Sequence, residues 1–242
     1  MRTLPPQRYF DALTATWAPL NVNAHGAFLI QSGGGGGKRV SAATLNSETV
    51  EQSDILSASE AMQSLGQNSL FMLRPEEAEF DLQLAGLDYQ IIDPTVIYAC
   101  PSEDLARHAS GGLSVIPGDI PLAAQKEIWA TDNIGPARIS VMERSSDPKG
   151  FLMGRHDDKI AGTAFVSSDD TIAMLHALTV SEHARRKGVG KNLTFGAAKW
   201  ALEHGSDVFA LAVTEANTAA RNLYEQIGMH EVSRYHYRIK LE

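Results

Sequence analysis

The stretch LTVSEHARRKGVGKNL, residues 178–193, constrains the fold more than any other part of the chain. It begins with an apolar run that ends at Val180, as expected for a buried strand. A short basic loop with Gly188 and Gly190 follows, and from residue 189 apolar residues recur every three to four positions. That spacing predicts an amphipathic helix. A strand that enters a helix through a short glycine-containing loop indicates an α/β fold.

The neighbouring segments extend this pattern. KIAGTAFVSS and TIAMLHALTV, within residues 159–180, are strand-like, and so is DVFALAV at 207–213. NTAARNLYEQIG, residues 217–228, has the apolar spacing of a second helix that ends at Gly228. The terminal residues 230–242 are β-branched and aromatic enough for strands. We therefore predict a mixed central sheet flanked by helices.

The loop before the first helix has the properties of a pyrophosphate site. Backbone N–H groups of a first helical turn have no intrahelical partner, and the helix dipole adds positive potential there. Glycines let an anion approach these donors closely. Cationic side chains surround them: Arg185, Arg186, Lys187 and Lys191. A solvated basic surface is the alternative interpretation, and the adjacent glycines favour an anion.

Two motifs, one in this loop and one further along the chain, give the sequence a family resemblance. Arg185-x-x-Gly188-x-Gly190 resembles the R/Q-x-x-G-x-G/A signature of the GCN5-related N-acetyltransferases (GNAT). The second motif of that family, N-x-x-A-x-x-L-Y-x-x-x-G-F/M, is present in full as Asn217, Ala220, Leu223, Tyr224, Gly228 and Met229. It follows an apolar strand, as in the family. The resemblance covers residues 119–242.

The resemblance implies acetyl-CoA as co-substrate and acetyl transfer to a primary amine by direct attack in a ternary complex. It implies that Tyr224 protonates the departing thiolate, although Tyr224 also lies on an apolar helix stripe and could serve only packing. It further implies that the pantetheine arm lies along the backbone near residues 178–180. The cofactor-binding residues expected on these grounds are Leu178, Thr179, Val180, Arg185, Arg186, Lys187, Gly188, Val189, Gly190, Lys191 and Asn217.

The general base is less clearly marked. A glutamate often found on this strand of the family falls at Met174, so it is missing here. MLHALTV resembles the H-x-H-A-L stretch of the arylalkylamine branch, where His176 matches the second histidine. If the strand alternates, Met174, His176, Leu178 and Val180 share one face. His176 could accept a proton at neutral pH, or it could be a buried core histidine, and water is the other candidate base.

Residues 1–118 carry no recognisable catalytic motif, but they contain a possible repeat. Residues 70–93 show the same order of apolar strand, helix, glycine and strand as residues 210–233. Aligning Gly86 with Gly228 gives an offset of 142, which places Leu82 opposite Tyr224 and Pro75 opposite Asn217. We therefore predict two modules in tandem: a degenerate acetyltransferase-like module at 1–118 and the GNAT domain at 119–242. An unrelated N-terminal domain is the alternative.

The five-glycine run SGGGGGKR, residues 32–39, resembles a phosphate-binding P-loop but fails its spacing. Ser32 stands where the first glycine belongs, and Arg39 stands where Ser or Thr belongs. Strand-like segments flank the run, so we predict a hairpin connection. This argues against a nucleotide phosphotransferase. A non-catalytic acyl-CoA-binding or regulatory protein remains the second hypothesis.

Composition argues against several classes of binding partner and favours one cellular compartment. The formal net charge is −8, which argues against nucleic-acid binding. No run of about 18 apolar residues suggests a membrane span, and no His/Cys cluster has metal-ligand spacing. The single cysteine, Cys100, and the two prolines near the N-terminus favour a cytoplasmic protein over a secreted one. The acceptor amine could be a small molecule or a peptide, and the sequence leaves a homodimer open.

Overall fold

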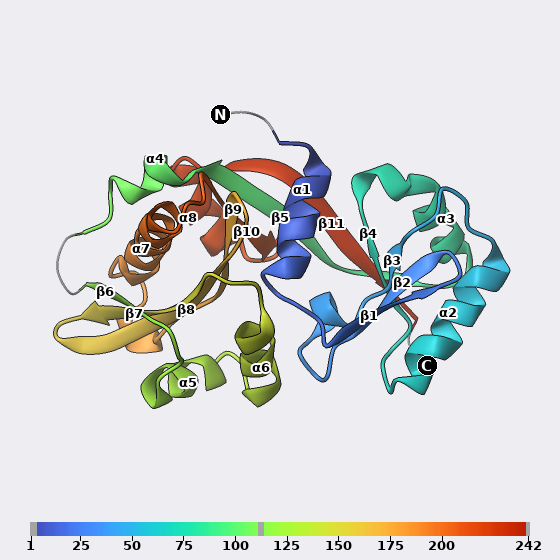
Figure 1. The fold of residues 1–242 in the computed structure, drawn as a ribbon, viewed down its shortest axis with the longest axis horizontal. Helices are drawn as coiled ribbons and strands as arrows, with labels where there is room; N and C mark the ends of the chain where they lie inside the picture. The colour runs from blue at the N-terminus through green and yellow to red at the C-terminus, as the bar shows by residue number, and fades with distance from the viewer. Residues whose placement is uncertain (1–3, 111–113, 241–242) are drawn as a thin grey trace. The chain divides into compact units, whose positions relative to one another are not determined.

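The computed structural model describes residues 4–110 and 114–240. The chain forms two compact units, each assembled from separate stretches of sequence (Figure 1). Unit 1 consists of Met1–Ala18, Ile97–Val213 and Thr218–Val232, and unit 2 consists of Pro19–Val96, Thr214–Asn217 and Ser233–Glu242.

Unit 1 contains most of the helices of the described residues. Its helices are α1 (Pro6–Ala15), α4 (Ser102–Ala106), α5 (Ala123–Ala130), α6 (Pro136–Arg144), α7 (Val189–Glu203) and α8 (Thr218–Gln226), with a 3-10 turn at Glu182–Ala184. Its strands are β6 (Val115–Gly118), β7 (Lys149–His156), β8 (Lys159–Asp169), β9 (Ile172–Val180) and nearly all of β10 (Val208–Thr214).

Unit 2 contains a small antiparallel sheet and two helices. Its elements are β1 (Asn21–His25), β2 (Phe28–Ser32), β3 (Thr44–Leu45), α2 (Gln52–Ser64), β4 (Leu70–Leu73) and α3 (Ala78–Gly86), with 3-10 turns at Lys38–Val40 and Pro75–Glu77. Two long strands, β5 (Gln90–Pro101) and β11 (His230–Ile239), run through both units.

The main sheet has eight strands in the order β4-β11-β5-β10-β9-β8-β7-β6. Strands β6 to β9 pair antiparallel, whereas β9 and β10 pair parallel. The parallel pair needs a crossover connection, and α7 supplies it between residues 189 and 203. The predicted mixed α/β sheet is confirmed, as are the predicted strands within 159–180 and 207–213 and both predicted helices.

In unit 1 the sheet presents two different faces to its helices. On one face glycines let α7 approach closely: a Cβ at Gly154 or Gly162 would lie within 3.1 Å of the Leu193 side chain. On the other face aromatic rings meet α5 and α1: Phe151 is tilted against Phe165, with 5.2 Å between ring centroids, and Trp129 meets Phe151 edge-on at 6.3 Å. The small residues set how closely α7 packs, and the aromatic rings fill the space under α5 and α1.

The predicted division at residue 118 does not coincide with the compact units. Helix α1 and residues 97–118 belong with the second half of the chain, whereas residues 233–242 belong with the first half. The cause is sheet formation, since β5 and β11 each contribute one end to each unit. The assignment of two evolutionary modules to 1–118 and 119–242 stays a prediction.

The strand–helix–strand repeat is present in the structure, but the predicted offset of 142 is wrong. Helices α3 and α8 begin at Ala78 and Thr218, and strands β5 and β11 begin at Gln90 and His230, so the offset is 140. Both helices end alike: Tyr89 N–H donates to Leu84 O, and Met229 N–H donates to Tyr224 O, each at 3.0 Å.

The glycine alignment failed for a conformational reason. The left-handed residue that ends the second helix is Gly228 (φ +94°), and its counterpart is Asp88 (φ +66°), not Gly86, which lies inside α3. Asp tolerates this conformation better than most residues. With the corrected offset, Tyr224 corresponds to Leu84 and Asn217 to Glu77. The first repeat therefore lacks both the phenol and the amide.

The glycine run lies in unit 2 and forms a hairpin connection, as predicted. Strand β2 ends at Ser32, and Phe28 and Leu29 pair antiparallel with Leu45 and Thr44 of β3. A three-residue 3-10 turn, and not an α-helix, follows the glycines. Its lysine, Lys38, forms an ion pair with Asp93 at 2.5 Å. The run thus lacks the helix N-terminus that a P-loop requires.

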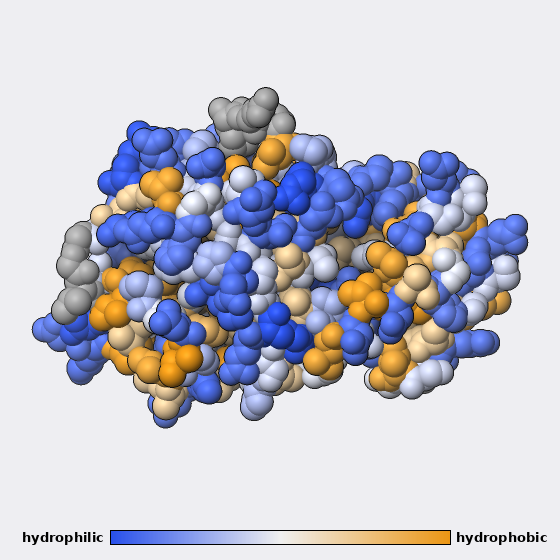
Figure 2. Space-filling model, viewed as in Figure 1, coloured by the Kyte–Doolittle hydropathy of each residue, from blue (hydrophilic) through white to orange (hydrophobic). Residues whose placement is uncertain are grey.

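Surface hydrophobicity is scattered. The large exposed apolar side chains, among them Leu82 and Ile120, come from many elements. On the face that Figure 2 shows, orange apolar residues form small groups separated by blue hydrophilic ones. Single exposed apolar residues are normal for proteins in water. Among the described residues no helix has both the length and the apolarity needed to cross a membrane.

Candidate active site

The predicted phosphate loop lies at the start of α7, at the carboxyl end of β9. Gly188 is the residue before the helix and has a left-handed backbone (φ +82°), and Arg186 is also left-handed (φ +60°). The first helical hydrogen bond runs from Asn192 N–H to Gly188 O at 2.9 Å. The N–H groups of residues 189–191 therefore have no helical carbonyl to bind. The side chains of the four predicted cations are exposed around them.

The glycines keep the space in front of these donors open. A Cβ on Gly188 would meet nothing within 4 Å, so the region before the helix is clear. A Cβ on Gly190 would contact Val180, Leu178 and Leu223 at 3.6–3.9 Å. This contact places the first turn of α7 against the end of β9 and the apolar side of α8. The predicted residues of the phosphate loop and of the strand end are thus brought together.

Strands β9 and β10 separate next to this helix terminus. Their parallel pairing runs from Ile172 and Val208 to Leu175 and Leu211, and the register ends there, although β9 continues to Val180. The β10 side of residues 176–180 is therefore left without strand pairing. On its other side, β9 stays paired with β8 as far as Val180. This opening, the splay between β9 and β10, includes residues 178–180, along which the resemblance implies that the pantetheine arm lies.

The predicted alternation of β9 is wrong beyond His176. Ala177 has a left-handed backbone (φ +51°), and the β8–β9 register shifts there, so that Thr163 pairs with Thr179 but Phe165 pairs with His176. This β-bulge adds one residue to β9 and reverses the faces that follow it. His176 therefore shares its face with Thr179, whereas Leu178 and Val180 lie on the α7 face.

The side chain of Trp129, on α5, is hydrogen-bonded to the backbone of the bulge. Its Nε1–H donates to Ala177 O at 2.7 Å, and the ring is fully buried. Thr179, immediately beyond the bulge, is 2 % exposed, and its hydroxyl has no hydrogen-bond partner among the described residues. A buried hydroxyl without a partner costs free energy unless something pairs with it. The bulge thus sets a polar group into the face that α1 and α5 cover.

His176 is buried on this aromatic face. It is 5 % exposed and lies against Trp17 (5.2 Å between centroids) and Phe165 (6.1 Å). Its Nε2 lies 2.8 Å from the hydroxyl of Thr16, just after α1. His176 is the first residue of β9 beyond the end of the β9–β10 pairing, and its ring has the surroundings of a packed core residue, so its role as a base stays a prediction.

Tyr224 of α8 is 7 % exposed, and burial raises the pKa of its phenol from 10.0 to about 12. Its ring tilts against Tyr98 of β5, with 6.3 Å between centroids. Tyr98 in turn donates to Glu225 at 2.5 Å and accepts from Arg221 at 3.2 Å. The raised pKa keeps the Tyr224 phenol protonated at neutral pH, as a proton donor requires.

Asn217 is the one predicted residue that falls outside unit 1. It lies in the turn Thr214–Asn217, which belongs to unit 2, and its backbone N–H donates to Thr214 O at 3.0 Å. Its side chain is exposed. The other twelve predicted residues belong to unit 1. No set of three His, Cys, Asp or Glu side chains in the described parts of the chain could hold a metal ion.

Three residues around His176 and the bulge were not predicted from the sequence: Thr16, Trp17 and Trp129. The first two follow α1, more than 150 residues before the strand they contact. Trp129 lies on α5, where its own surroundings in the sequence give no sign of a hydrogen bond to the bulge. The available signal was the spacing of the apolar residues Tyr9, Phe10 and Leu13, which marks a buried helix face but not the strand it packs against.

Comparison with known proteins decides the family. Residues 122–229 match the family described as "Acetyltransferase (GNAT) family". This segment belongs to the GNAT family. The GNAT domain so defined contains the predicted phosphate loop, the splay between β9 and β10, His176 and Tyr224.

Two curated relatives match the GNAT domain. The uncharacterized N-acetyltransferase YobR of Bacillus subtilis (strain 168) is 32% identical over 100 residues, 41% of this chain and 40% of the relative. The mycothiol acetyltransferase of Thermobispora bispora is 34% identical over 104 residues, 43% of this chain and 32% of the relative. The chain thus matches less than half the length of either relative.

Solved structures share the fold over nearly the whole chain. A GCN5-related N-acetyltransferase from Kribbella flavida has a TM-score of 0.73 at 16% identity and covers 97% of this chain and 95% of its own. A tandem GNAT protein from the clavulanic acid biosynthesis pathway has a TM-score of 0.59 at 12% identity, with coverage of 94% and 86%. The GNAT-like fold therefore extends beyond the segment that matches by sequence.

Proposed function

We propose that this chain is an acetyl-CoA-dependent N-acetyltransferase that acetylates a primary amine. The observation that carries the proposal is the end of β9–β10 pairing at Leu175 and Leu211, beside the start of α7. Ligands of open α/β sheets bind in crevices at the carboxyl ends of parallel strands. The named activity of both curated relatives, acetyl transfer, supports the same reaction.

The residues at this position fit acetyl-CoA. The N–H groups of residues 189–191 and the left-handed Gly188 suit a diphosphate, and four cationic side chains add charge around it. The unpaired edge of residues 176–180 offers backbone donors and acceptors to the amides of a pantetheine chain. When bound there, acetyl-CoA supplies an activated acyl group.

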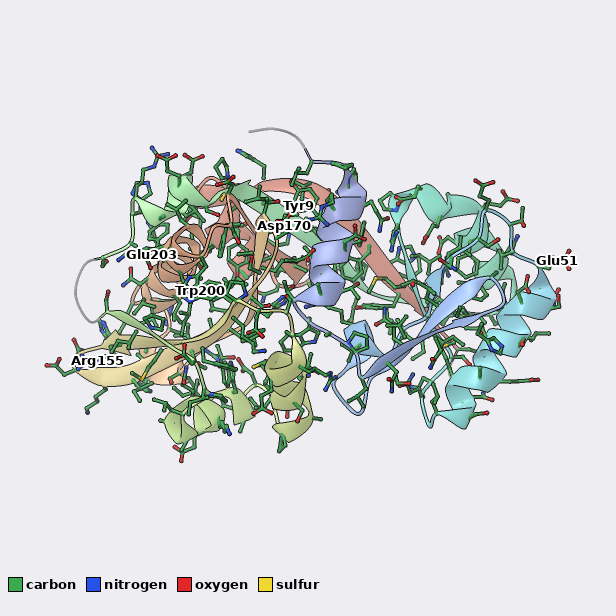
Figure 3. The ribbon with its side chains drawn as sticks, in the orientation of Figure 1. Tyr9, Glu51, Arg155, Asp170, Trp200 and Glu203 are labelled. Atoms are coloured by element: carbon green, nitrogen blue, oxygen red, sulfur yellow. The ribbon has the colours of Figure 1, made fainter. Side chains whose placement is uncertain are left out.

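The first repeat does not offer a second site of this kind. At the start of α2, labelled by Glu51 in Figure 3, the Asp54 carboxylate accepts from Glu51 N–H at 2.9 Å, and Asp54 N–H donates to Glu51 O at 3.0 Å. A carboxylate therefore occupies the helix N-terminus. We infer one acetyl-CoA per chain.

Two side chains handle the protons of the reaction. The amine nitrogen forms a bond to the thioester carbonyl carbon, the carbon–sulfur bond breaks, and sulfur leaves with the bonding electrons. Tyr224 gives its phenolic proton to the sulfur as the carbon–sulfur bond breaks, and the phenolate that results is reprotonated from water. The proton lost by the amine goes to His176, directly or through water. Holding the reactants in line supplies much of the acceleration.

An assay tests this function directly. Acetyl-CoA is titrated calorimetrically into the protein, and thiol release is then followed with a panel of primary amines that includes polyamines, aminoglycosides, amino sugars, aryl-alkylamines and lysine peptides. We expect micromolar binding and amine-dependent release of one thiol per acetylated product. Binding without transfer to any amine would instead support the non-catalytic acyl-CoA-binding protein. The absence of binding would refute both.

A further inference from the structure

One hydroxyl, Thr16 Oγ1, connects the N-terminal helix to the predicted base. It lies 2.6 Å from Ala12 O and 2.8 Å from His176 Nε2. A threonine hydroxyl has one proton to donate, and a carbonyl oxygen can only accept. Thr16 must therefore donate to Ala12 O and accept from His176. It follows that Nε2 of His176 carries a proton.

The surroundings of His176 hold the ring in that orientation. Thr16 is fully buried, and Trp17 and Phe165 lie against the imidazole. A flipped ring would present a C–H group to the Thr16 oxygen and lose the hydrogen bond. A neutral imidazole that is protonated at Nε2 carries its lone pair on Nδ1.

Few charges share this buried face. The titratable side chains on the elements packed against β9 are Arg8, Tyr9 and Asp11 of α1, Lys126 and Glu127 of α5, Lys159 and Asp169 of β8, and Lys191, Lys199 and Glu203 of α7. Of these only Tyr9, labelled on α1 in Figure 3, is buried, and burial raises its pKa further above 10.0. No buried carboxylate from these elements therefore competes with Thr16 for the imidazole.

We propose that Thr16 is a positioning residue for the acetyl transfer, which holds His176 as the Nε2–H tautomer with Nδ1 as its proton-accepting nitrogen. This inference rests on the proposed function, because it assigns a role within that reaction. It also gives α1, which lies outside the matched residues 122–229, a part in the active site.

The tautomer is measured in the protein without substrate. Selective ¹⁵N-histidine labelling and long-range ¹H–¹⁵N spectra distinguish a protonated from an unprotonated ring nitrogen, and the variant His176→Gln identifies the signal. We expect wild type and Thr16→Ser to show the Nε2–H pattern, and Thr16→Val to show a mixture of tautomers. Thr14→Val is the matched control, since Thr14 donates to Phe10 O in the same helix without meeting a histidine.

Kinetics then test the role. We expect Thr16→Val to lower kcat about tenfold and to shift the acid limb of its pH profile downward, because a lost acceptor destabilises the protonated ring. KM for acetyl-CoA should stay unchanged, and Thr16→Ser should restore both readouts. An Nδ1–H pattern in wild type, or a Thr16→Val variant identical to wild type in spectrum and profile, overturns the role of Thr16. Wild type that acetylates no amine while showing the Nε2–H pattern overturns the proposed function instead.

Discussion

Arg238 of β11 holds Asp81 of α3 with two parallel hydrogen bonds, Nε to Oδ1 at 2.8 Å and Nη2 to Oδ2 at 3.2 Å. The same guanidinium donates to Tyr89 O at 2.8 Å, and His236 Nε2 lies 2.9 Å from Asp81 Oδ1. The two side chains of the ion pair are 11 % and 24 % exposed. This mostly buried cluster ties the last strand of the chain to a helix of the first repeat, within unit 2.

Removing the charge of Asp81 should destabilise the protein. Asp81→Asn leaves a mostly buried guanidinium without its counter-charge, and we expect a loss of about 2 kcal/mol in the free energy of unfolding at pH 7. Arg238 holds the pKa of Asp81 below 3.8, so its contribution is present above that pH and is lost on acidification. Urea unfolding from pH 7 to pH 3 should therefore show the difference between wild type and variant shrinking.

Asp104→Asn is the control for that experiment. Asp104 pairs with Arg107 on the surface, where both side chains are at least half exposed. Exposed pairs contribute little, and we expect a change within about 0.5 kcal/mol at either pH. A cost for Asp81→Asn no larger than this would show that the cluster in unit 2 contributes no net stability.

The two ends of α7 allow a matched test of the phosphate loop. Gly188 and Gly205 have nearly the same left-handed backbone, φ +82° and +84°, and a Cβ on either would meet nothing within 4 Å. Gly188→Asp and Gly205→Asp should each lose about 1 kcal/mol to backbone strain, and the helix dipole should make the loss smaller for Gly188→Asp than for Gly205→Asp. Only Gly188→Asp should weaken acetyl-CoA binding, by about tenfold or more, because its carboxylate would oppose the diphosphate. Equal affinities by calorimetry would place the cofactor elsewhere.

Tyr224 and Tyr98 form a second matched pair. Tyr224→Phe should lower kcat by about 100-fold, as expected for loss of a general acid, with little change in acetyl-CoA affinity. Tyr98→Phe removes a phenol that donates to Glu225, and it should cost about 1 kcal/mol of stability while preserving turnover. Steady-state rates and calorimetry check both. Weaker cofactor binding with normal turnover in Tyr224→Phe would assign that residue to packing.

The buried thiol of Cys100 should make the protein less stable at alkaline pH. It is 1 % exposed, and burial raises the pKa of its thiol from 9.0 to about 12, with a smaller contribution from Asp104. The unfolded thiol ionises first, so the contribution of this group is complete below pH 9 and is lost as the pH rises toward 12.

Cys100→Ala tests that linkage. We expect it to cost about 1 kcal/mol at pH 8, from the lost packing of one heavy atom, and less at pH 10.5. Urea unfolding at the two pH values gives the comparison, and the raised pKa of Tyr224 affects both proteins alike. A cost that is the same at both pH values would contradict the predicted linkage.

The sequence predicted the second half well because its signals are local. Apolar strands, helical spacing, and glycines such as Gly205 and Gly228 mark where each element ends, and both occupy the left-handed conformation expected there. The bulge at Ala177 escaped prediction, since an alanine in a left-handed conformation leaves no local mark. Asp88 is also left-handed without a local mark in the sequence, so the repeat offset of 140 could not be predicted from a glycine alignment. The role of α1 depends on a contact between Thr16 and His176, 160 residues apart.

The paths of β5 and β11 bear on how such a protein can evolve. Each closes one strand–helix–strand repeat, and each starts in the unit opposite to the one where it ends. This arrangement amounts to an exchange of terminal segments between two strand–helix–strand repeats inside a single polypeptide. A duplicated gene ordinarily leaves two halves that recombination can separate again. After such an exchange neither half can be lost without removing strands from the other, so the first repeat is retained as an inseparable part of the fold.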